Sequence, residues 1–398
     1  MIMELTPEFL IKEMEKVGAH FDSFSIFLRK SRIIPLKIFD INSPTANILK
    51  QEMLAIGGDV VVHKNVVNCR VDKGDVILLG TKKHYDILMN KLENISYFDI
   101  PKVYKLLKNF FEKDKVSYIE SPWKRKITFN RTLIMGIINV TPDSFYAGSR
   151  KINLEEILNT AKYMIENKVD IIDIGGQSTR PGSDPIDEDE EINRVIPAVK
   201  IIRENFSNVF ISVDTYRAKV AEKAIELGAD MINDISGFRL DDSLVKVVSE
   251  HKIPYVLMHM KGTPKDMQVN PYYEDLIKEI YEFFLERLNY AEKYGVDLDK
   301  VVIDPGIGFG KRYEDNLEIL ARITEFKSLK KPILIGASRK SFIGKALGDI
   351  PPEERLEGTL GVTALCVLKD VDIVRVHDVK ENKRVIDVIE ALKCIRPS

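Results

Sequence analysis

The stretch Asp304-Pro305-Gly306-Ile307-Gly308-Phe309-Gly310 joins an acidic side chain to a segment that must turn sharply. It follows the apolar run 301–303 and precedes a helical pattern that opens near Tyr313. Proline fixes φ and lacks an amide donor, while glycine permits positive φ and the close approach of a ligand. The motif therefore leaves a carboxylate at the end of a strand, where α/β folds bind their ligands. A tight turn in which Asp304 caps the next helix explains the motif equally well.

Polar side chains of complementary types follow other apolar runs in the same way. Asp214, Asn233, Asp304 and Lys340 provide two carboxylates, an amide and an ammonium group, which suit a flat heterocycle with adjacent N–H donors and ring acceptors. A second, cationic group suits a phosphate or pyrophosphate. It consists of Arg180, Arg375 and His377, with Asn139 nearby. Asn139, together with phosphate oxygens of a ligand, is also a candidate ligand of Mg²⁺, which binds few protein groups.

The elements that must position these side chains repeat regularly after Arg131. Eight apolar, strand-like runs alternate with eight helical patterns. The strands are expected at 132–140, 170–175, 209–214, 231–236, 254–260, 301–304, 332–337 and 373–377, and the helices at 153–167, 188–204, 216–227, 241–250, 272–294, 313–325, 339–368 and 380–393. Buried parallel strands read as continuous apolar runs. Eight βα units predict a (β/α)8 TIM barrel over residues 131–398, with the polar residues gathered at one rim.

Length and composition bound the remaining possibilities. The chain has 398 residues, which predicts two domains. The formal net charge of -2 gives no electrostatic reason to expect binding to nucleic acid or to an anionic membrane. No apolar run approaches membrane-spanning length, and the start lacks the pattern of a signal peptide. Three widely spaced cysteines indicate a reducing, cytoplasmic setting.

The residues before the barrel have a different pattern. Residues 1–112 predict a smaller α+β domain of unknown role, with helices at 9–17, 42–55 and 82–92 and strands at 36–41, 60–62 and 76–79. Residues 113–130 are charged and contain Pro122, which predicts a linker. The single tryptophan, Trp123, lies in this stretch and is a candidate for packing between the domains.

The motifs of the barrel, taken together and in order, resemble the dihydropteroate synthase family of folate biosynthesis. The resemblance covers residues 131 to about 395. The motifs that carry it are Asn139-Val140-Thr141-Pro142-Asp143-Ser144-Phe145, Ser178-Thr179-Arg180-Pro181-Gly182, Val213-Asp214-Thr215, Ile232-Asn233-Asp234, Asp304-Pro305-Gly306-Ile307-Gly308-Phe309-Gly310, Ser338-Arg339-Lys340 and Arg375-Val376-His377-Asp378. Each motif alone is a modest signal, whereas their fixed order over eight units is specific.

The resemblance implies an enzyme that joins 6-hydroxymethyl-7,8-dihydropterin pyrophosphate to p-aminobenzoate, with Mg²⁺ as cofactor and a homodimer as the assembly. By matching motif, the pterin would be held by Asp214, Asn233, Asp304 and Lys340. Pyrophosphate would be held by Asn139, Arg180, Arg375 and His377, and Mg²⁺ by Asn139. The p-aminobenzoate pocket would be formed by Phe145, Thr179, Pro181, Phe309, Lys340 and Ser341. The residues expected to act in catalysis are Asp214, Lys340, Arg180, Arg375 and His377.

These roles predict an S_N1-like displacement. Cationic groups would stabilise the leaving pyrophosphate, and Asp214 would stabilise the positive charge shared between the pterin ring and its methylene. An arylamine is weakly basic, so its attack needs no strong general base. Closure of the first two loops over the pterin would complete the amine pocket, which predicts that the pterin substrate binds first.

Two positions depart from the family pattern, and two other functions stay open. Gln177 stands where the family usually has glutamate, and Lys261 stands where arginine is common.

The first alternative is a methyltransferase that moves a methyl group from methyltetrahydrofolate to a corrinoid protein. Such an enzyme shares the pterin-holding Asp and Asn positions but does not need the three cationic motifs. The second alternative is a non-catalytic pterin-binding protein whose residues 1–112 recruit another enzyme.

Overall fold

A computed structural model describes residues 2–3, 5, 7–68, 70–140, 154–177 and 186–395. The chain divides into two compact units, one within residues 1–114 and the other formed by Lys115–Lys393. Within the described residues, no helix is both long enough and apolar enough to cross a membrane.

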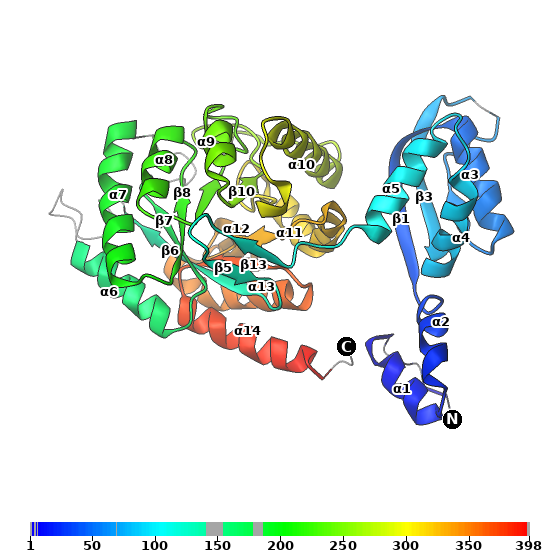
Figure 1. Ribbon diagram of the computed structural model, residues 1–398, viewed down its shortest axis with the longest axis horizontal. Helices are drawn as coiled ribbons and strands as arrows, with labels where there is room; N and C mark the ends of the chain where they lie inside the picture. Colours follow the sequence, from blue (N-terminus) through cyan, green and yellow to red (C-terminus); the bar gives the residue numbers. More distant parts are fainter. Residues whose placement is uncertain are drawn as a thin grey trace. The chain divides into compact units, whose positions relative to one another are not determined.

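The larger unit is a (β/α)8 barrel (Figure 1). Its strands are all parallel and lie side by side in the order β11-β10-β9-β8-β7-β6-β13-β12. A further parallel bridge joins Ile303 on β11 to Ile333 beside β12, which brings the two end strands together. The strands are β6 Leu133–Asn139, β7 Ile171–Gly175, β8 Phe210–Asp214, β9 Met231–Asp234, β10 Tyr255–Met258, β11 Val301–Asp304, β12 Leu334–Ile335 and β13 Ile373–Val376.

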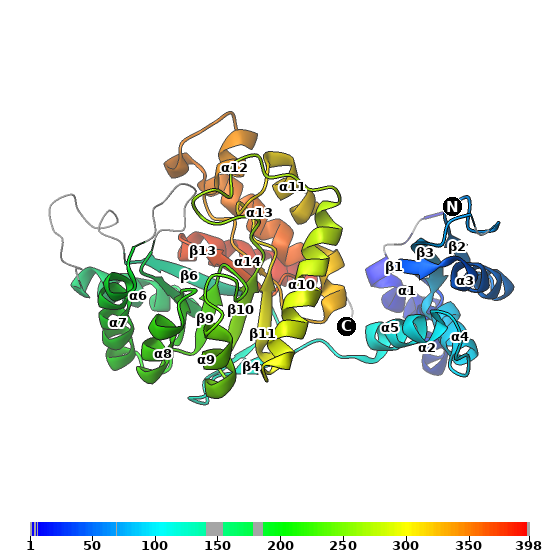
Figure 2. The ribbon, with the colours of Figure 1, turned by 90° about the horizontal axis from the view of Figure 1, so that it is seen from above.

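Helices surround these strands on the outside (Figures 1 and 2). They are α6 Leu154–Glu166, α7 Glu188–Asn205, α8 Ala218–Glu226, α9 Leu244–His251, α10 Leu276–Lys293, α11 Tyr313–Arg322, α12 Ser341–Ala346, α13 Leu356–Leu368 and α14 Val379–Lys393. Helix α8, for example, presents an apolar face to the sheet with Val220, Ala224 and Ile225. The expectation of one helix over 339–368 was wrong. Gly348 and Asp349 have positive φ, and Pro351 and Pro352 follow them, so the segment breaks between α12 and α13.

The amino-terminal end of the barrel is covered by a β-hairpin, β4 Tyr118–Glu120 and β5 Lys126–Thr128. Ile119 and Ile127 pack beneath a layer of side chains from all eight strands. Trp123, in the turn of this hairpin, donates from Nε1 to the carbonyl oxygen of Ala229 at 3.0 Å. Most of the stretch expected to be a linker therefore belongs to the barrel unit. The reason is that Ile119 and Ile127 both point to the amino-terminal end of the barrel and are buried there.

Cations from the same segment reach three aspartates that stand just before strands. Lys115 pairs with Asp372, Arg125 with Asp230 and Arg131 with Asp170, at 2.6, 2.7 and 2.6 Å. Each aspartate also accepts a backbone N–H of the neighbouring strand, from Ile333, Ile211 and Ile134 respectively. These ion pairs attach the hairpin segment to three separate places at the amino-terminal end of the barrel.

The smaller unit is an α+β domain, as the sequence predicts. Its antiparallel sheet has the order β1-β3-β2, with β1 Ile33–Asn42, β2 Asp59–Val61 and β3 Lys73–Thr81. Helices α3 Ser43–Ala55, α4 Lys82–Leu92 and α5 Ile100–Glu112 share one apolar core with it. The first helices are α1 Leu10–Val17 and α2 Phe24–Leu28. Helix α5 was not among the predicted elements, although Ile100, Val103 and Leu107 mark its buried face.

Candidate active site

The strand register places four residues in one row at the carboxyl end of the barrel. Asn139 on β6 lies beside Gly175 on β7, and Gly175 lies beside Asp214 on β8. Asn233 on β9 continues the row beyond Asp214. A Cβ atom at Gly175 would lie 3.7 Å from Asp214 Oδ2 and 3.8 Å from Asn139 Oδ1. Gly175 therefore opens the space that two of the predicted site residues share.

Arg375 on β13 joins two buried carboxylates from neighbouring strands. Its Nε donates to Asp173 Oδ2 at 2.6 Å, and its Nη2 donates to Asp214 Oδ2 at 2.6 Å. Asn233 Nδ2 also donates to Asp173 Oδ2, at 3.0 Å. Burial raises the pKa of Asp214, and the positive charge of Arg375 opposes that rise. The structure thus brings Asp214, Asn233 and Arg375 into one connected cluster.

Asp304 and Lys340 lie on the other side of the site. Asp304 ends β11, and its Oδ1 accepts the N–H of Gly306 at 2.7 Å. Burial raises the pKa of Asp304, and the charge of Lys340 opposes this effect. Lys340 precedes α12, and burial lowers its pKa to about 8. Its Nζ donates to the carbonyl oxygen of Ile307 and lies 4.6 Å from the centre of the Phe309 ring.

The ends of β12 and β13 position the remaining described candidates. His377 follows β13, and its Nδ1 lies 2.9 Å from the hydroxyl of Ser338. Arg339 turns away into an ion pair with Asp378, with Nε 2.8 Å from Oδ2. This leaves Lys340 as the cation of its motif that faces Asp304 and Phe309. Ser341 is exposed at the start of α12.

Four predicted residues lie outside the described part of the chain. They are Phe145, Thr179, Arg180 and Pro181. The structure describes all four pterin candidates. It also describes the other candidates that lie outside the first two loops, which are Asn139, Arg375, His377, Phe309 and Ser341.

A cluster of apolar side chains, which was not predicted from the sequence, lies beside Asn233 and Asp304. Met258, Met260 and Met267 cluster there with Ile235, and Tyr216 and Phe309 pack against them. Methionine side chains adapt their shape to an apolar or aromatic surface. The Met-His-Met sequence at the end of β10 was the available signal. His259 itself is buried, and its Nδ1 lies 3.0 Å from Lys311 Nζ, so it is a core histidine with a hydrogen-bond partner.

Two further charged residues of the site were also missed. Asp173 is fully buried and bonded to Arg375 and Asn233, yet one of its oxygens, Oδ1, has no hydrogen-bond partner. Its position follows from two-residue alternation, since Ile171 belongs to the barrel's inner layer and Asp173 and Gly175 share its side. Lys311 follows the glycine-rich motif directly, and nothing in its sequence position signals its burial.

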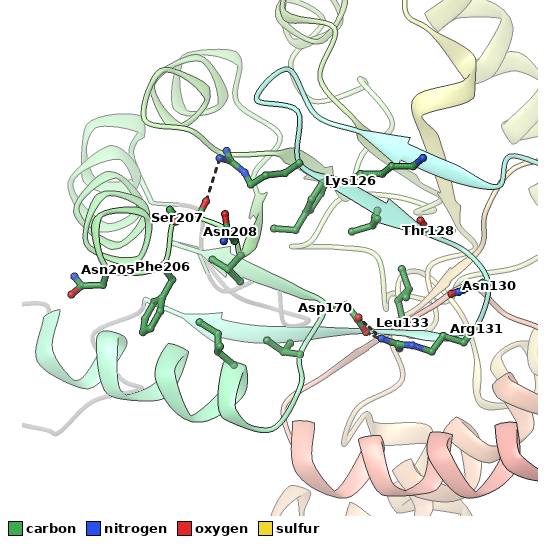
Figure 3. A pocket seen from close by; sticks show the side chains of 16 residues that line it. Lys126, Thr128, Asn130, Arg131, Leu133, Asp170, Asn205, Phe206, Ser207 and Asn208 are labelled. Atoms are coloured by element: carbon green, nitrogen blue, oxygen red, sulfur yellow. Dashed lines mark hydrogen bonds and ion pairs between the residues drawn. The ribbon is translucent and has the colours of Figure 1, made fainter.

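A pocket of about 750 Å³ lies at the opposite, amino-terminal end of the barrel (Figure 3). The cations that line it already have partners. Arg131 pairs with Asp170, Arg125 donates to the carbonyl oxygen of Ser207, and Lys126 lies over the ring of Tyr118. The pocket faces the starts of the strands, whereas ligands of barrel enzymes bind at their carboxyl ends. The candidate active site is therefore the cluster around Asp214 and Asp304.

Comparison with known proteins agrees with this location. A family model described as "Pterin binding enzyme" matches residues 135–377. The dihydropteroate synthase of Clostridium beijerinckii is 48% identical over 255 residues, which cover 64% of this chain and 91% of that protein. The chain belongs to the dihydropteroate synthase family. It is an enzyme of the transferase class, in keeping with this membership.

Solved structures of the family share the barrel. The dihydropteroate synthase of Yersinia pestis, determined in complex with a sulfonamide drug, superposes with a TM-score of 0.66 at 37% identity. The superposition covers 70% of this chain and 99% of the Yersinia chain. The part of this chain that the family member does not cover is therefore comparable in size to the smaller, N-terminal unit.

One relative extends beyond the barrel. The probable bifunctional folylpolyglutamate synthase/dihydropteroate synthase of Halobacterium salinarum is 37% identical over 357 residues. These cover 89% of this chain and 42% of that protein. The alignment is longer than the barrel unit, so the similarity reaches into the N-terminal unit.

Proposed function

We propose that the barrel joins 6-hydroxymethyl-7,8-dihydropterin pyrophosphate to p-aminobenzoate, giving 7,8-dihydropteroate and pyrophosphate. The observation that carries the proposal is the grouping of buried acids, an amide and cations at the carboxyl ends of the strands. Asp214, Asn233 and Arg375 form one part of the group, and Asp304 and Lys340 form the other. An amino-pyrimidinone ring offers the donors and acceptors that such a set requires.

The pterin would be held by Asp214, Asn233, Asp304 and Lys340. Carboxylates accept pairs of N–H groups from the amino-pyrimidinone edge, and the amide of Asn233 both donates and accepts. The ammonium of Lys340 would donate to a ring acceptor. Burial of Asp304 and Asn233 supports this role, because hydrogen bonds to a ligand are stronger where water is excluded. Gly175 leaves room for the ring beside Asp214.

The chemical step would break the bond between the pterin methylene and the pyrophosphate oxygen before the amine attacks. Arg375 and His377, with Arg180 from the second loop, would stabilise the charge on the leaving pyrophosphate. The carboxylate of Asp214 would stabilise the positive charge that the pterin shares with its methylene. The amine nitrogen would then form the new C–N bond and release one proton to solvent. The contact between Asp214 and the pterin would thus matter more in the transition state than in the ground state.

The amine would bind after the pterin substrate. Phe309 and the stem of Lys340 offer an apolar surface for the aromatic ring, and Ser341 would contact the carboxylate at the start of α12. Phe145, Thr179 and Pro181 would complete this pocket when the first two loops close. If amine binding proved equally tight with and without pyrophosphate or pterin pyrophosphate, the ordered scheme would be abandoned.

The residues present fit a magnesium ion that is held largely by the substrate. The amide oxygen of Asn139 borders the space opened by Gly175, near the carboxylate of Asp214. Within the described residues, no group of three or more histidine, cysteine or acidic side chains is placed to hold a metal. Mg²⁺ commonly takes one or two protein oxygens together with substrate phosphates. When bound there, it would supply positive charge next to the leaving pyrophosphate.

The proposal includes a homodimer that works in the cytoplasm. Helices α13 and α14 pack together, and both of them expose large apolar residues. Leu368, Val388 and Leu392 are 46%, 61% and 56% exposed. Contiguous apolar patches on a protein surface mark interaction sites. Sedimentation of the wild-type chain and of Val388→Glu tests this assignment, since the substitution should shift the mass from dimer to monomer.

The N-terminal unit would support assembly or stability. Its own apolar core includes residues from all three strands and from α3, α4 and α5, so it has the makings of a separately packed domain. The similarity to the Halobacterium salinarum protein reaches into this unit, so that relative carries a similar segment beside its barrel. A chain lacking residues 1–112 should differ from the full chain in the number of protomers per assembly or in melting temperature. An unchanged oligomeric state, melting temperature and turnover would count against this role.

Product identity tests the proposed reaction against its rivals. Purified chain, dihydropterin pyrophosphate and Mg²⁺ are incubated with isotopically labelled p-aminobenzoate, and the products are separated and identified by mass. Label in 7,8-dihydropteroate, formed only when both substrates are present, supports the proposal. Methyl transfer from methyltetrahydrofolate to a corrinoid protein without dihydropteroate would favour the methyltransferase. Pterin binding without any product would favour a non-catalytic binding protein.

A further inference from the structure

The glycine-rich loop after β11 is held by hydrogen bonds along its whole length. Each backbone carbonyl oxygen from Gly306 to Gly310 accepts one. The donors, in order, are Phe309 N, Lys340 Nζ, Gln268 Nε2, Lys311 Nζ and Tyr273 Oη. Four of these five donors are side chains, and three belong to other elements of the barrel. The loop is therefore a fixed platform for Phe309.

Lys311 is the most deeply enclosed of these donors. The residue is 3% exposed, and its Nζ lies 3.0 Å from His259 Nδ1, 3.1 Å from the carbonyl oxygen of Phe309 and 3.5 Å from that of His259. His259 in turn donates its backbone N–H to the carbonyl oxygen of Asp304 at 2.9 Å. The ammonium group thus joins the segment after β10 to the later part of the glycine-rich loop, and the backbone N–H of His259 joins the same segment to the start of the loop.

Glycine brings these two segments into direct backbone contact. A Cβ atom at Gly306 would lie 1.9 Å from the carbonyl oxygen of His259 and 3.4 Å from Lys311 Nζ. A Cβ atom at Gly310 would lie 2.2 Å from the carbonyl oxygen of Lys261. Both glycines have positive φ. No side chain other than hydrogen fits at either position, so the loop has little freedom to move away from β10.

Burial disfavours the charged form of Lys311, and the charged groups around it act in both directions. Burial lowers the pKa of Lys311 to about 7, against the favourable charge of Asp304. Lys340 and Arg239 oppose its protonation and Asp315 favours it. Burial, followed by the charge of Lys311, holds the pKa of His259 well below its usual range. His259 is therefore neutral, and its Nδ1 accepts a hydrogen bond from the lysine. Strongly shifted pKa values cluster at functional sites, which favours a role for Lys311 in this one.

We propose that Lys311 is a positioning residue that acts through His259 and the carbonyl oxygen of Phe309 to set the aromatic wall of the amine pocket. The inference rests on the proposed function, in which Phe309 contacts p-aminobenzoate. Lys311 does not touch substrate. It holds the loop whose opposite edge is held by Lys340, so the Phe309 ring stays within 4.6 Å of the Lys340 ammonium group.

Lys311→Met tests this role, and Lys331→Met is its matched control. Lys331 is also a buried lysine, 2% exposed, but it precedes β12 at the other end of the barrel, where it donates to the carbonyl oxygen of Leu298. The KM for p-aminobenzoate should rise about tenfold or more in Lys311→Met, as expected for the loss of one charged hydrogen bond. Calorimetry should find the affinity for dihydropterin pyrophosphate little changed. Lys331→Met should leave both values near those of the wild type.

Substitutions of His259 provide a second test that does not depend on the folding of Lys311→Met. Asparagine carries an acceptor oxygen close to the place of Nδ1, so His259→Asn should keep an amine KM near the wild-type value. His259→Leu should raise that KM as Lys311→Met does. The double variant His259→Leu/Lys311→Met should rise no further, because the two residues act as one unit. An unchanged amine KM in folded Lys311→Met or in His259→Leu would overturn the inference.

The wild-type arm separates this inference from the proposed function. Wild-type chain without amine-dependent turnover would overturn both. Wild-type turnover with a selective rise in the amine KM of Lys311→Met supports both. Wild-type turnover with an equal loss in Lys311→Met and Lys331→Met would leave the proposed function standing and reject the positioning role, because a general loss of stability would then explain the result.

Discussion

Arg375 Nη2 lies 2.6 Å from Asp214 Oδ2, while Nε of the same guanidinium lies 2.6 Å from Asp173 Oδ2. A single cation therefore bridges two acids from adjacent strands at the base of the site. Asp173 is fully buried, and the side chain of Asp214 is 9% exposed. Buried charges of one sign are tolerated only with such a partner. The cluster therefore places the carboxylate of Asp214 at the site before any ligand arrives, and the charge of Arg375 favours its ionised form.

Asp214→Asn removes that charge while keeping the size of the side chain. Turnover should fall by about 10²–10³-fold, which is the usual cost of losing one preorganised electrostatic contact to a transition state. Binding of dihydropterin pyrophosphate should weaken much less, because the contact strengthens as positive charge develops. Steady-state kinetics and calorimetry give the two values. Asp242→Asn, at an exposed position, is the control and should behave as the wild type.

Arg375→Met should destabilise the barrel as well as stop turnover. The substitution leaves Asp173 and Asp214 as buried carboxylates without their cation, which costs about 3–5 kcal/mol of unfolding free energy. Arg322 provides the comparison, because it pairs with Glu318 and Glu325 on the surface. Arg322→Met should cost no more than about 1 kcal/mol. Urea unfolding measures both, and similar losses for the two variants would contradict the assignment of Arg375 to a buried network.

The rate should depend on pH through two groups of the site. Asp214 must be ionised, and burial raises its pKa, so kcat/KM for the pterin substrate should rise over a range well above the ordinary aspartate pKa of about 4. Lys340 must be protonated, and burial lowers its pKa to about 8, so kcat/KM should fall as pH rises through about 8. A bell-shaped profile is therefore expected. In Lys340→Arg the fall should move to higher pH, and a fall that stays in place would exclude Lys340 as its source.

The barrel could be read from the sequence because its elements repeat a simple pattern. Continuous apolar runs such as 301–303 predicted buried parallel strands, and polar residues such as Asp214 and Asp304 followed them at the expected rim. The break between α12 and α13 depends on the combination of Gly348 with Pro351 and Pro352, which the helical periodicity of 339–368 concealed. The partners of Arg375 and Lys311 were beyond sequence reasoning, because they depend on which side chains meet across separate strands.

The hairpin β4–β5 illustrates the same limit at the other end of the barrel. Its charged composition and Pro122 predicted a linker, but the alternation of Ile119 and Ile127 buries both beneath the strands. Ile119→Ala should therefore lower the free energy of unfolding by about 2–5 kcal/mol, as for other buried large-to-small substitutions. Val269→Ala, at a position that is 75% exposed, should change it by less than about 0.5 kcal/mol. A negligible effect of Ile119→Ala would indicate that the segment is a linker.

Pyrophosphate release tests the proposed reaction most directly. The full chain is mixed with dihydropterin pyrophosphate and Mg²⁺, and released pyrophosphate is followed with and without p-aminobenzoate. We predict release that depends on the amine, matches the dihydropteroate formed and is nearly abolished by Asp214→Asn. Tight binding of the pterin without amine-dependent release would contradict the account and would instead favour a pterin-binding protein without this activity.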